Sequence, residues 1–233
     1  MSERVVITGA NRGLGLELAR AYAARGDTVI AGCRHPEAVP GLRALTRFVY
    51  PLDTGDERSI AAFSAQVGDG AVDVLYNNAG LDARAFGADD AERDVLSLSA
   101  DRFERVMRVN AIGPMLLVRA LLPMLKRSAH ARIVNVSSQI GSMVVSASLG
   151  RDVSYASSKA ALNMITVKLA WRLRSDHIIA IALHPGHLRT AMGGATADMD
   201  APVAVAAIVE LISGLALGQS GGFYRWDGTV HPW

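Results

Sequence analysis

The residues that decide the fold are Arg4-Val-Val-Ile-Thr-Gly-Ala-Asn-Arg-Gly-Leu-Gly15, an apolar run that ends in a glycine-rich turn. A short run of β-branched apolar residues that stops at glycine is typical of a parallel strand buried on both faces. From Leu14 to Arg25 the apolar residues recur at helical spacing, and Gly26 provides a helix stop. The sequence therefore predicts a strand, a tight turn and a helix in succession.

The glycines at 9, 13 and 15 also indicate a function for this turn. Glycine lets the backbone approach a pyrophosphate, which then faces the N-terminus of the following helix. The spacing G-x-x-x-G-x-G differs from the usual G-x-G-x-x-G of dinucleotide-binding proteins, and a glycine turn can also simply connect a strand to a helix. The position directly after the first strand favours nucleotide binding.

Strands and helices alternate along the rest of the chain. Six more apolar runs are predicted as strands, at residues 28–33, 47–52, 72–76, 132–136, 178–183 and 223–226, and helical patterns lie between them, notably at 101–126, 155–174 and 201–217. This alternation predicts an α/β fold with a parallel sheet covered on both faces. No repeat or linker divides the chain, so we expect one domain over residues 1–233.

Three irregular stretches, 81–99, 139–152 and 187–200, each follow the carboxyl end of a predicted strand. Ligands of open α/β sheets bind at that edge. Loops of this length in a compact domain are more often functional than idle. We therefore expect these three stretches to form the substrate pocket.

Composition narrows the class of protein. The 233 residues are 50% hydrophobic and 20% charged, as in a soluble globular protein, and the net charge of +2 is too small to indicate a nucleic-acid partner. Cys33 is the single cysteine, so no intramolecular disulfide forms, and His184 and His187 have no third ligand at metal spacing. With no signal peptide and no apolar run long enough to span a bilayer, we expect a cytoplasmic protein with no metal and no membrane contact.

A second short stretch carries the candidate chemistry, Tyr155-Ala-Ser-Ser-Lys159 with Ser138 upstream. Four-residue spacing places Tyr155 and Lys159 on one face of a helix. A free tyrosine has a pKa of about 10, and a nearby cation lowers that value toward the range of a general acid/base. The pair alone also fits a tyrosine at a core edge with a solvated lysine.

The end of the second predicted strand indicates the nucleotide. A carboxylate there would bind the ribose hydroxyl of NAD, whereas arginine accommodates the 2′-phosphate of NADP. The sequence has Gly-Cys-Arg-His at 32–35 and no acid, and Arg12 in the glycine turn adds a second cation. Two guanidiniums favour NADP(H) over NAD(H). The alternative is two solvated surface arginines.

Taken together, the glycine turn, Asn77-Asn-Ala-Gly80, Asn110, Ser138 and the Tyr155/Lys159 pair resemble the short-chain dehydrogenase/reductase family over essentially the whole chain. The segments 184–194 and 220–233 are similar to its carbonyl-reductase-like branch, related to the bacterial C-factor and to Sniffer. The resemblance implies a Rossmann-type, doubly wound, parallel seven-stranded sheet of order 3-2-1-4-5-6-7.

The resemblance also implies the site residues. The implied catalytic set is Asn110, Ser138, Tyr155 and Lys159, with Asn110 kinking its helix and holding a relay water. The implied cofactor-binding set comprises Gly9, Asn11, Arg12, Gly13, Leu14, Gly15, Arg34, Asp53, Asn78, Ala79, Gly80, Tyr155, Lys159, Pro185, Gly186, Leu188 and Thr190. Ser137 is one residue early in the strand and faces the other way.

The expected reaction is reduction of a small-molecule ketone or aldehyde to an alcohol, with Tyr155 as general acid/base. Met143 and the adjacent Val144 and Val145 are candidates to touch the substrate. Pairing through the helices 101–126 and 155–174 would give a homodimer or homotetramer, as family members commonly form. The alternatives are an NADP(H)-binding regulatory or signalling protein with little turnover, an alcohol-oxidising enzyme, or a reductase of acyl-carrier-bound ketones.

Overall fold

A computed structural model describes residues 2–148, 150, 152–190, 197 and 199–233. The seven expected strands form one parallel sheet of order β3-β2-β1-β4-β5-β6-β7, which confirms the predicted fold class and strand order. Their bounds are β1 Arg4–Thr8, β2 Thr28–Cys33, β3 Val49–Pro51, β4 Val74–Asn77, β5 Arg132–Val136, β6 Ile179–His184 and β7 Phe223–Arg225. Order reverses between β1 and β4, the switch point at which doubly wound sheets bind ligands.

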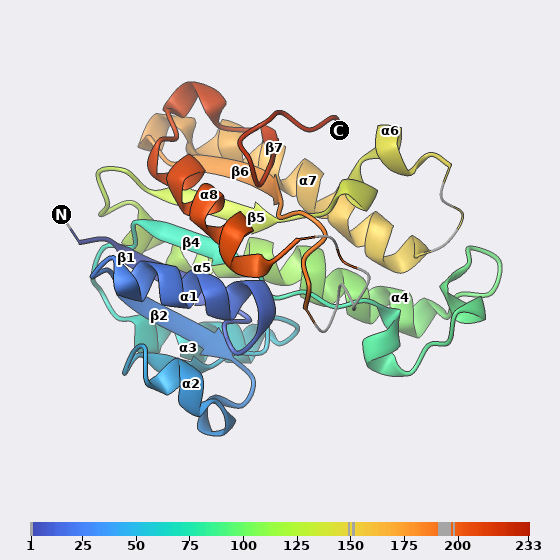
Figure 1. The fold of residues 1–233 in the computed structure, drawn as a ribbon, viewed down its shortest axis with the longest axis horizontal. Helices are drawn as coiled ribbons and strands as arrows, with labels where there is room; N and C mark the ends of the chain where they lie inside the picture. The colour runs from blue at the N-terminus through green and yellow to red at the C-terminus, as the bar shows by residue number, and fades with distance from the viewer. Residues whose placement is uncertain (1, 149, 151, 191–196, 198) are drawn as a thin grey trace.

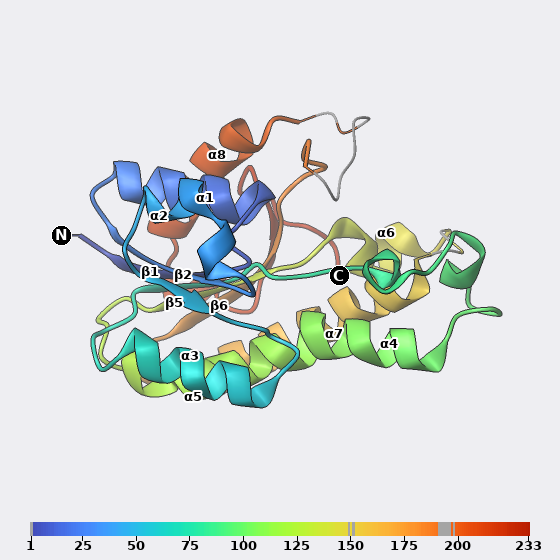
Figure 2. The ribbon, with the colours of Figure 1, turned by 90° about the horizontal axis from the view of Figure 1, so that it is seen from below.

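Helices cover both faces of the sheet (Figures 1 and 2). On one face lie α1 (Gly13–Ala24), α2 (Pro40–Arg43) and α8 (Ala201–Ser213), and on the other lie α3 (Glu57–Val67), α5 (Gly113–Leu125) and α7 (Val153–Leu173). Two shorter helices, α4 (Ala100–Met107) and α6 (Met143–Ser146), lie beyond the end of the sheet to which the strands point. This end carries the three irregular stretches.

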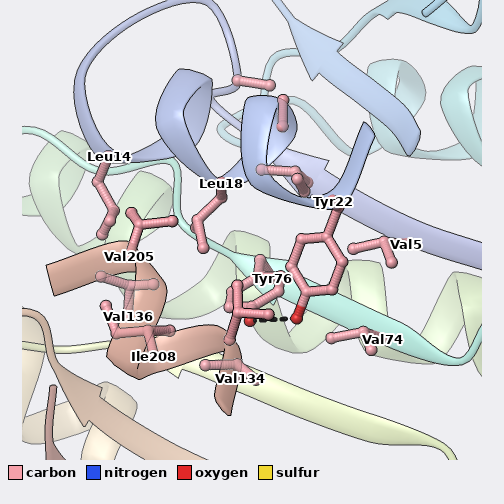
Figure 3. Packing of buried hydrophobic residues seen from close by; sticks show 14 of the residues in the cluster. Val5, Leu14, Leu18, Tyr22, Val74, Tyr76, Val134, Val136, Val205 and Ile208 are labelled. Atoms are coloured by element: carbon pink, nitrogen blue, oxygen red, sulfur yellow. Dashed lines mark hydrogen bonds between the residues drawn. The ribbon is translucent and has the colours of Figure 1, made fainter. Parts of the chain in front are cut away.

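Side chains alternate in direction along each strand, so the sheet has one hydrophobic core on each face. In β1, Val5 and Ile7 belong to the cluster under α1 and α8, whereas Val6 belongs to the cluster under α3 and α5. Successive side chains of a strand point to opposite faces, so a strand buried on both sides is mostly apolar at every position and not only at alternate ones. Figure 3 shows the first cluster, in which the buried Tyr22 and Tyr76 hydroxyls lie 2.8 Å apart.

Some helices and strands differ in extent from the predicted ranges. The predicted helix 101–126 is a continuous helical path, Ala100–Leu125, that is widened by a π-helical turn at Arg108–Ile112. A Cβ at Gly113 would lie 2.2 Å from the Thr54 carbonyl oxygen, so the path can pass this closely only with glycine there. The third strand is shorter than predicted, and α8 ends at Ser213 because Gly214 follows it.

Among the described residues, Ala100–Leu125 is also the one helix long and apolar enough to cross a membrane, judged by length and composition alone. A core helix meets the same criterion. The buried residues Leu117, Leu121 and Leu125 pack into the cluster under α3 and α5, and this packing accounts for the apolar composition.

Candidate active site

Tyr155 and Lys159 lie one turn apart near the start of α7, as their spacing predicts. Lys159 is buried, and its Nζ donates a hydrogen bond of 2.7 Å to the Val136 carbonyl at the end of β5. The same Nζ lies 5.5 Å from the centre of the Tyr155 ring. The end of β5 therefore holds the ammonium group beside the tyrosine.

Ser138 follows β5 and brings its hydroxyl to Tyr155. It caps a short turn by accepting from the Ile140 N–H, at 3.4 Å, and it hydrogen-bonds with the Tyr155 side chain. Ser137 has a different role, because its buried hydroxyl lies 2.6 Å from Asn163 Oδ1. Ser138 is thus the serine of the pair whose hydroxyl is beside Tyr155.

Burial dominates the proton affinities at this site. It raises the pKa of Tyr155 to about 12, while hydrogen bonding to Ser138 opposes the rise and the charges of Asp82 and Asp152 add to it. Burial lowers the pKa of Lys159 to about 8. The expected lowering of the Tyr155 pKa is therefore wrong for the protein alone, because desolvation outweighs the opposing hydrogen bond with Ser138. At neutral pH the phenol keeps its proton and can donate it.

Asn110 lies behind the pocket in the π-helical turn, fully buried. Its Oδ1 accepts from the Leu81 N–H at 3.0 Å, and its Nδ2 donates to the Leu81 carbonyl at 2.7 Å and to Ser158 Oγ at 2.9 Å. The relay water that the resemblance assigns to Asn110 stays a prediction, and the side-chain amide is committed to these protein groups. Its direct effect is to hold the start of the 81–99 loop against α7.

The glycine turn is shaped for close contact. Gly9 has φ +63°, and a Cβ at Gly15 would lie 2.4 Å from the Gly9 carbonyl oxygen. Asn78 Nδ2 donates to the Thr8 carbonyl at 2.8 Å, which joins the ends of β1 and β4. No side chain caps the N-terminus of α1, so its first N–H groups face the cavity with the capacity to bind a pyrophosphate.

The adenosine end of the cavity carries the two predicted arginines. Arg12 and Arg34 are exposed and line it, and neither forms an ion pair with any residue that the structure describes. Asp53 lines the same region and accepts from the Gly55 N–H at 2.8 Å. The turn and the arginines together fit a phosphorylated dinucleotide, because the turn leaves room for the backbone to approach a pyrophosphate and the guanidiniums offer donors for a further phosphate.

The segment after β6 closes the other wall. Gly186 has φ +90°, and a Cβ there would meet the Met199 sulfur at 3.2 Å. Leu188 is buried and pairs with Met199 in a β-bridge. Thr190 approaches the glycine turn, since a Cβ at Gly13 would lie 3.4 Å from its methyl group. The residues after β6 and the turn after β1 therefore face each other.

One cavity of about 1250 Å³ collects most of the predicted site. Of the predicted residues, it is lined by Gly9, Asn11, Arg12, Gly13, Leu14, Arg34, Asp53, Asn78, Ala79, Gly80, Ser138, Tyr155, Lys159, Pro185, Gly186, Leu188 and Thr190. Gly15 and Asn110 do not line the cavity, but each contacts residues that do. Met143, Val144 and Val145 do not line it either; Met143 is 77% exposed on α6.

Two residues that sequence patterns do not assign to the site, Arg93 and Asp152, also line the cavity. They lie 59 residues apart and form an ion pair. No motif spacing joins them, so the sequence carries no signal for the contact. By sequence Arg93 is only one cation of a mixed patch with Arg84, Arg102 and Arg105, and in the structure all four pair with carboxylates.

Comparison with known proteins identifies the family and the fold. The family described as short chain dehydrogenase matches residues 3–201. C-signal of Myxococcus xanthus is 36% identical over 172 residues, which cover 74% of this chain and 99% of that protein.

Several solved structures match the whole chain, and two of them are carbonyl reductases at 30% identity or more. The NADPH-bound carbonyl reductase from chicken fatty liver has a TM-score of 0.88 and 32% identity, with 100% of this chain and 99% of that chain covered. The carbonyl reductase Sniffer of D. melanogaster has a TM-score of 0.88 and 30% identity, with both chains covered completely.

Proposed function

The chain belongs to the short-chain dehydrogenase family, and we propose that it is an NADP(H)-dependent reductase that converts a ketone or aldehyde into an alcohol. The observation that carries this proposal is the meeting of Ser138, Tyr155 and Lys159 on a cavity that the glycine turn also lines. A hydroxyl, a phenol and a buried ammonium are the groups that polarise and protonate a carbonyl oxygen.

The roles follow from the geometry of the free site. Ser138 donates a hydrogen bond to the carbonyl oxygen and stabilises the charge that develops there. Tyr155, protonated at neutral pH, gives its proton to the same oxygen, and the Lys159 ammonium stabilises the phenolate that remains. When bound, NADPH supplies the hydride for the carbonyl carbon. Alcohol oxidation uses the same groups in reverse.

Preference for NADP(H) rests on Arg12 and Arg34. Both line the cavity, and neither pairs with a carboxylate among the described residues. A guanidinium without a carboxylate partner takes up a phosphate without first breaking an ion pair. The similar carbonyl reductase from chicken fatty liver binds NADPH in its crystal structure, which agrees with this preference.

A signalling protein that binds NADP(H) without appreciable turnover is the second candidate. The relative named C-signal, 36% identical to this chain, favours it. The filled catalytic positions favour the enzyme, because Ser138, Tyr155 and Lys159 together supply the groups that carbonyl reduction needs. A carrier-protein partner receives little support, since Arg84 and Arg102 pair with Asp82 and Glu92.

Self-association through the outer faces of α5 and α7 is part of the same proposal. Large apolar side chains are exposed there: Met115 is 41% exposed, Met164 57% and Trp171 81%. Apolar and aromatic residues of this kind are enriched at interfaces. Light scattering of wild type and Met164→Lys tests it, and a monomeric wild type would exclude pairing through this face.

The deciding experiment measures NADPH consumption against a panel of aldehydes, ketones and quinones, with Tyr155→Phe as the matched variant. We expect turnover that disappears in Tyr155→Phe while NADPH binding persists. Binding without turnover on any member of the panel would favour the signalling protein. A wild type that binds neither NADPH nor NADH would refute both candidates.

A further inference from the structure

Arg93 is the one buried charged residue of the 81–99 loop, with 9% of its surface exposed. Its guanidinium donates hydrogen bonds to Asp90 in the same turn and to Asp152 across the cavity. Its buried Nε has no hydrogen-bond partner among the described residues. A guanidinium is seldom buried unless it is paired, because its partners must offset the cost of desolvation.

Asp152 is the residue that starts the catalytic helix. It occupies the N-cap of α7, three residues before Tyr155, with φ 64° and ψ 29°. Its carbonyl accepts from the Ala156 N–H at 2.8 Å, the first turn of the helix that carries the phenol. Left-handed backbone is uncommon for a residue with a side chain, although Asp and Asn tolerate it better than most.

The pair connects residues 82–99 to the start of α7. Within the described ranges, residues 82–99 form no other hydrogen bond or ion pair with α7. Their remaining ties go to α4, where Glu92 pairs with Arg102 and Arg105 stacks over Phe86 at 3.8 Å from the ring centre. Figure 1 shows this loop and the start of α7 at the same end of the molecule.

We propose that Arg93 is a positioning residue for the reductase, docking the 82–99 loop onto the start of α7 and neutralising the Asp152 carboxylate beside Tyr155. The inference rests on the proposed function. The ionisable groups that face Tyr155 are Asp82, Asp152 and Lys159. Arg84 pairs with Asp82 at 2.7 Å, so Arg93 completes the compensation of the two carboxylates.

Two variants separate charge from docking. Arg93→Gln leaves the Asp152 charge uncompensated, whereas Asp152→Asn removes that charge and keeps a residue that tolerates φ 64°. Both undock the loop, so both are expected to raise KM for a carbonyl substrate, by about tenfold for a lost partly buried pair. Both should leave NADPH affinity unchanged, because neither Arg93 nor Asp152 belongs to the cofactor-binding set that the resemblance implies.

The pH profile distinguishes the positioning role from a merely structural one. We would follow oxidation of benzyl alcohol with NADP⁺, whose cationic ring lowers the pKa of the phenol into a measurable range, and reduction of benzaldehyde for KM. In oxidation the phenolate accepts the proton of the alcohol, so the pKa of Tyr155 sets the acid limb of the rate profile. This limb should move up in Arg93→Gln and down in Asp152→Asn, each by about half a pH unit for a partly screened charge. In the double variant, Arg93→Gln with Asp152→Asn, both charges are gone, so the limb should lie near its wild-type pH. KM for benzaldehyde should stay raised, because the loop is still undocked.

Arg102→Gln is the matched control, because it removes an ion pair between the same loop and α4. It should leave the limb in place. Shifts of the same sign in Arg93→Gln and Asp152→Asn, or no shift in either, would overturn the electrostatic part of the proposal. A KM unchanged in both would overturn the docking part.

Amide hydrogen exchange tests the docking without turnover, so it also serves if the proposed function fails. Arg93→Gln should speed exchange in residues 82–99 and in the first turn of α7, whereas Arg102→Gln should speed it in 82–99 alone. Unchanged exchange at the start of α7 in Arg93→Gln would refute the docking role, whatever the activity of the wild type.

Discussion

Replacing Arg12 and Arg34 by serine tests whether the cavity selects NADP(H). Both side chains line the cavity and neither has a carboxylate partner among the described residues, so each variant removes a cation and breaks no ion pair. Serine keeps a polar surface at both positions. The loss in affinity can therefore be assigned to the contact with the 2′-phosphate.

The magnitude follows from the exposure of the two guanidiniums. A hydrogen bond to a charged group is worth about 1.5–3 kcal/mol, and exposure to solvent places these contacts at the lower end. A loss of about 1.4 kcal/mol is tenfold in Kd. Each single variant should thus bind NADPH about tenfold more weakly, and the double variant about a hundredfold if the two contacts are independent.

Fluorescence titration with NADPH and NADH measures the effect directly. NADH lacks the 2′-phosphate, so its Kd should change by less than about twofold. Arg119→Ser removes an exposed arginine that pairs with Glu57 and does not line the cavity, and it should change neither Kd. Equal losses for both cofactors in the double variant, or no loss for NADPH, would refute the reasoning about the 2′-phosphate.

Three further predictions concern buried groups. Tyr22→Phe leaves the Tyr76 hydroxyl without its 2.8 Å partner and should lower the free energy of unfolding in urea by about 1–3 kcal/mol, whereas the double phenylalanine variant should cost less than the two singles added. Lys159→Met removes a buried cation whose pKa is lowered to about 8. The variant should lose turnover, but at pH 7 its free energy of unfolding in urea should exceed that of wild type by about 1–2 kcal/mol. That advantage should shrink as pH rises above about 8, where folded Lys159 loses its proton before the unfolded chain does; an advantage that is constant with pH would contradict it. Asn110→Ala leaves both backbone groups of Leu81 without their partner and should cost about 2–4 kcal/mol, measured by thermal unfolding with Arg119→Ala as the control.

The fold was predictable because its signals are local. A buried parallel strand is mostly apolar, so β1, β2, β5 and β6 stand out in the sequence. The residues of a single strand do not specify its neighbours in the sheet. The predicted strand order came from the resemblance to the family, and the structure confirms it. The π-helical turn at 108–112 was not predictable as such, because neither helix propensity nor periodicity separates it from an α-helix.

The sequence by itself determined which chemical groups are present and on which elements they lie. The spacing of Tyr155 and Lys159 places them one turn apart on any helix, and the glycines at 9, 13 and 15 define a tight turn wherever the strand ends. These relations hold within a few residues of backbone, so no distant contact can alter them.

Only the tertiary structure decided how those groups behave. The pKa of Tyr155 rises where the local motif predicted a fall, because desolvation by the surrounding protein is the largest cause of the shift. The Asn110 amide is committed to Leu81, 29 residues away, and Arg93 is buried against Asp152, 59 residues away. Burial and charge compensation depend on which distant segments the fold brings into contact, and no periodicity of the chain records that.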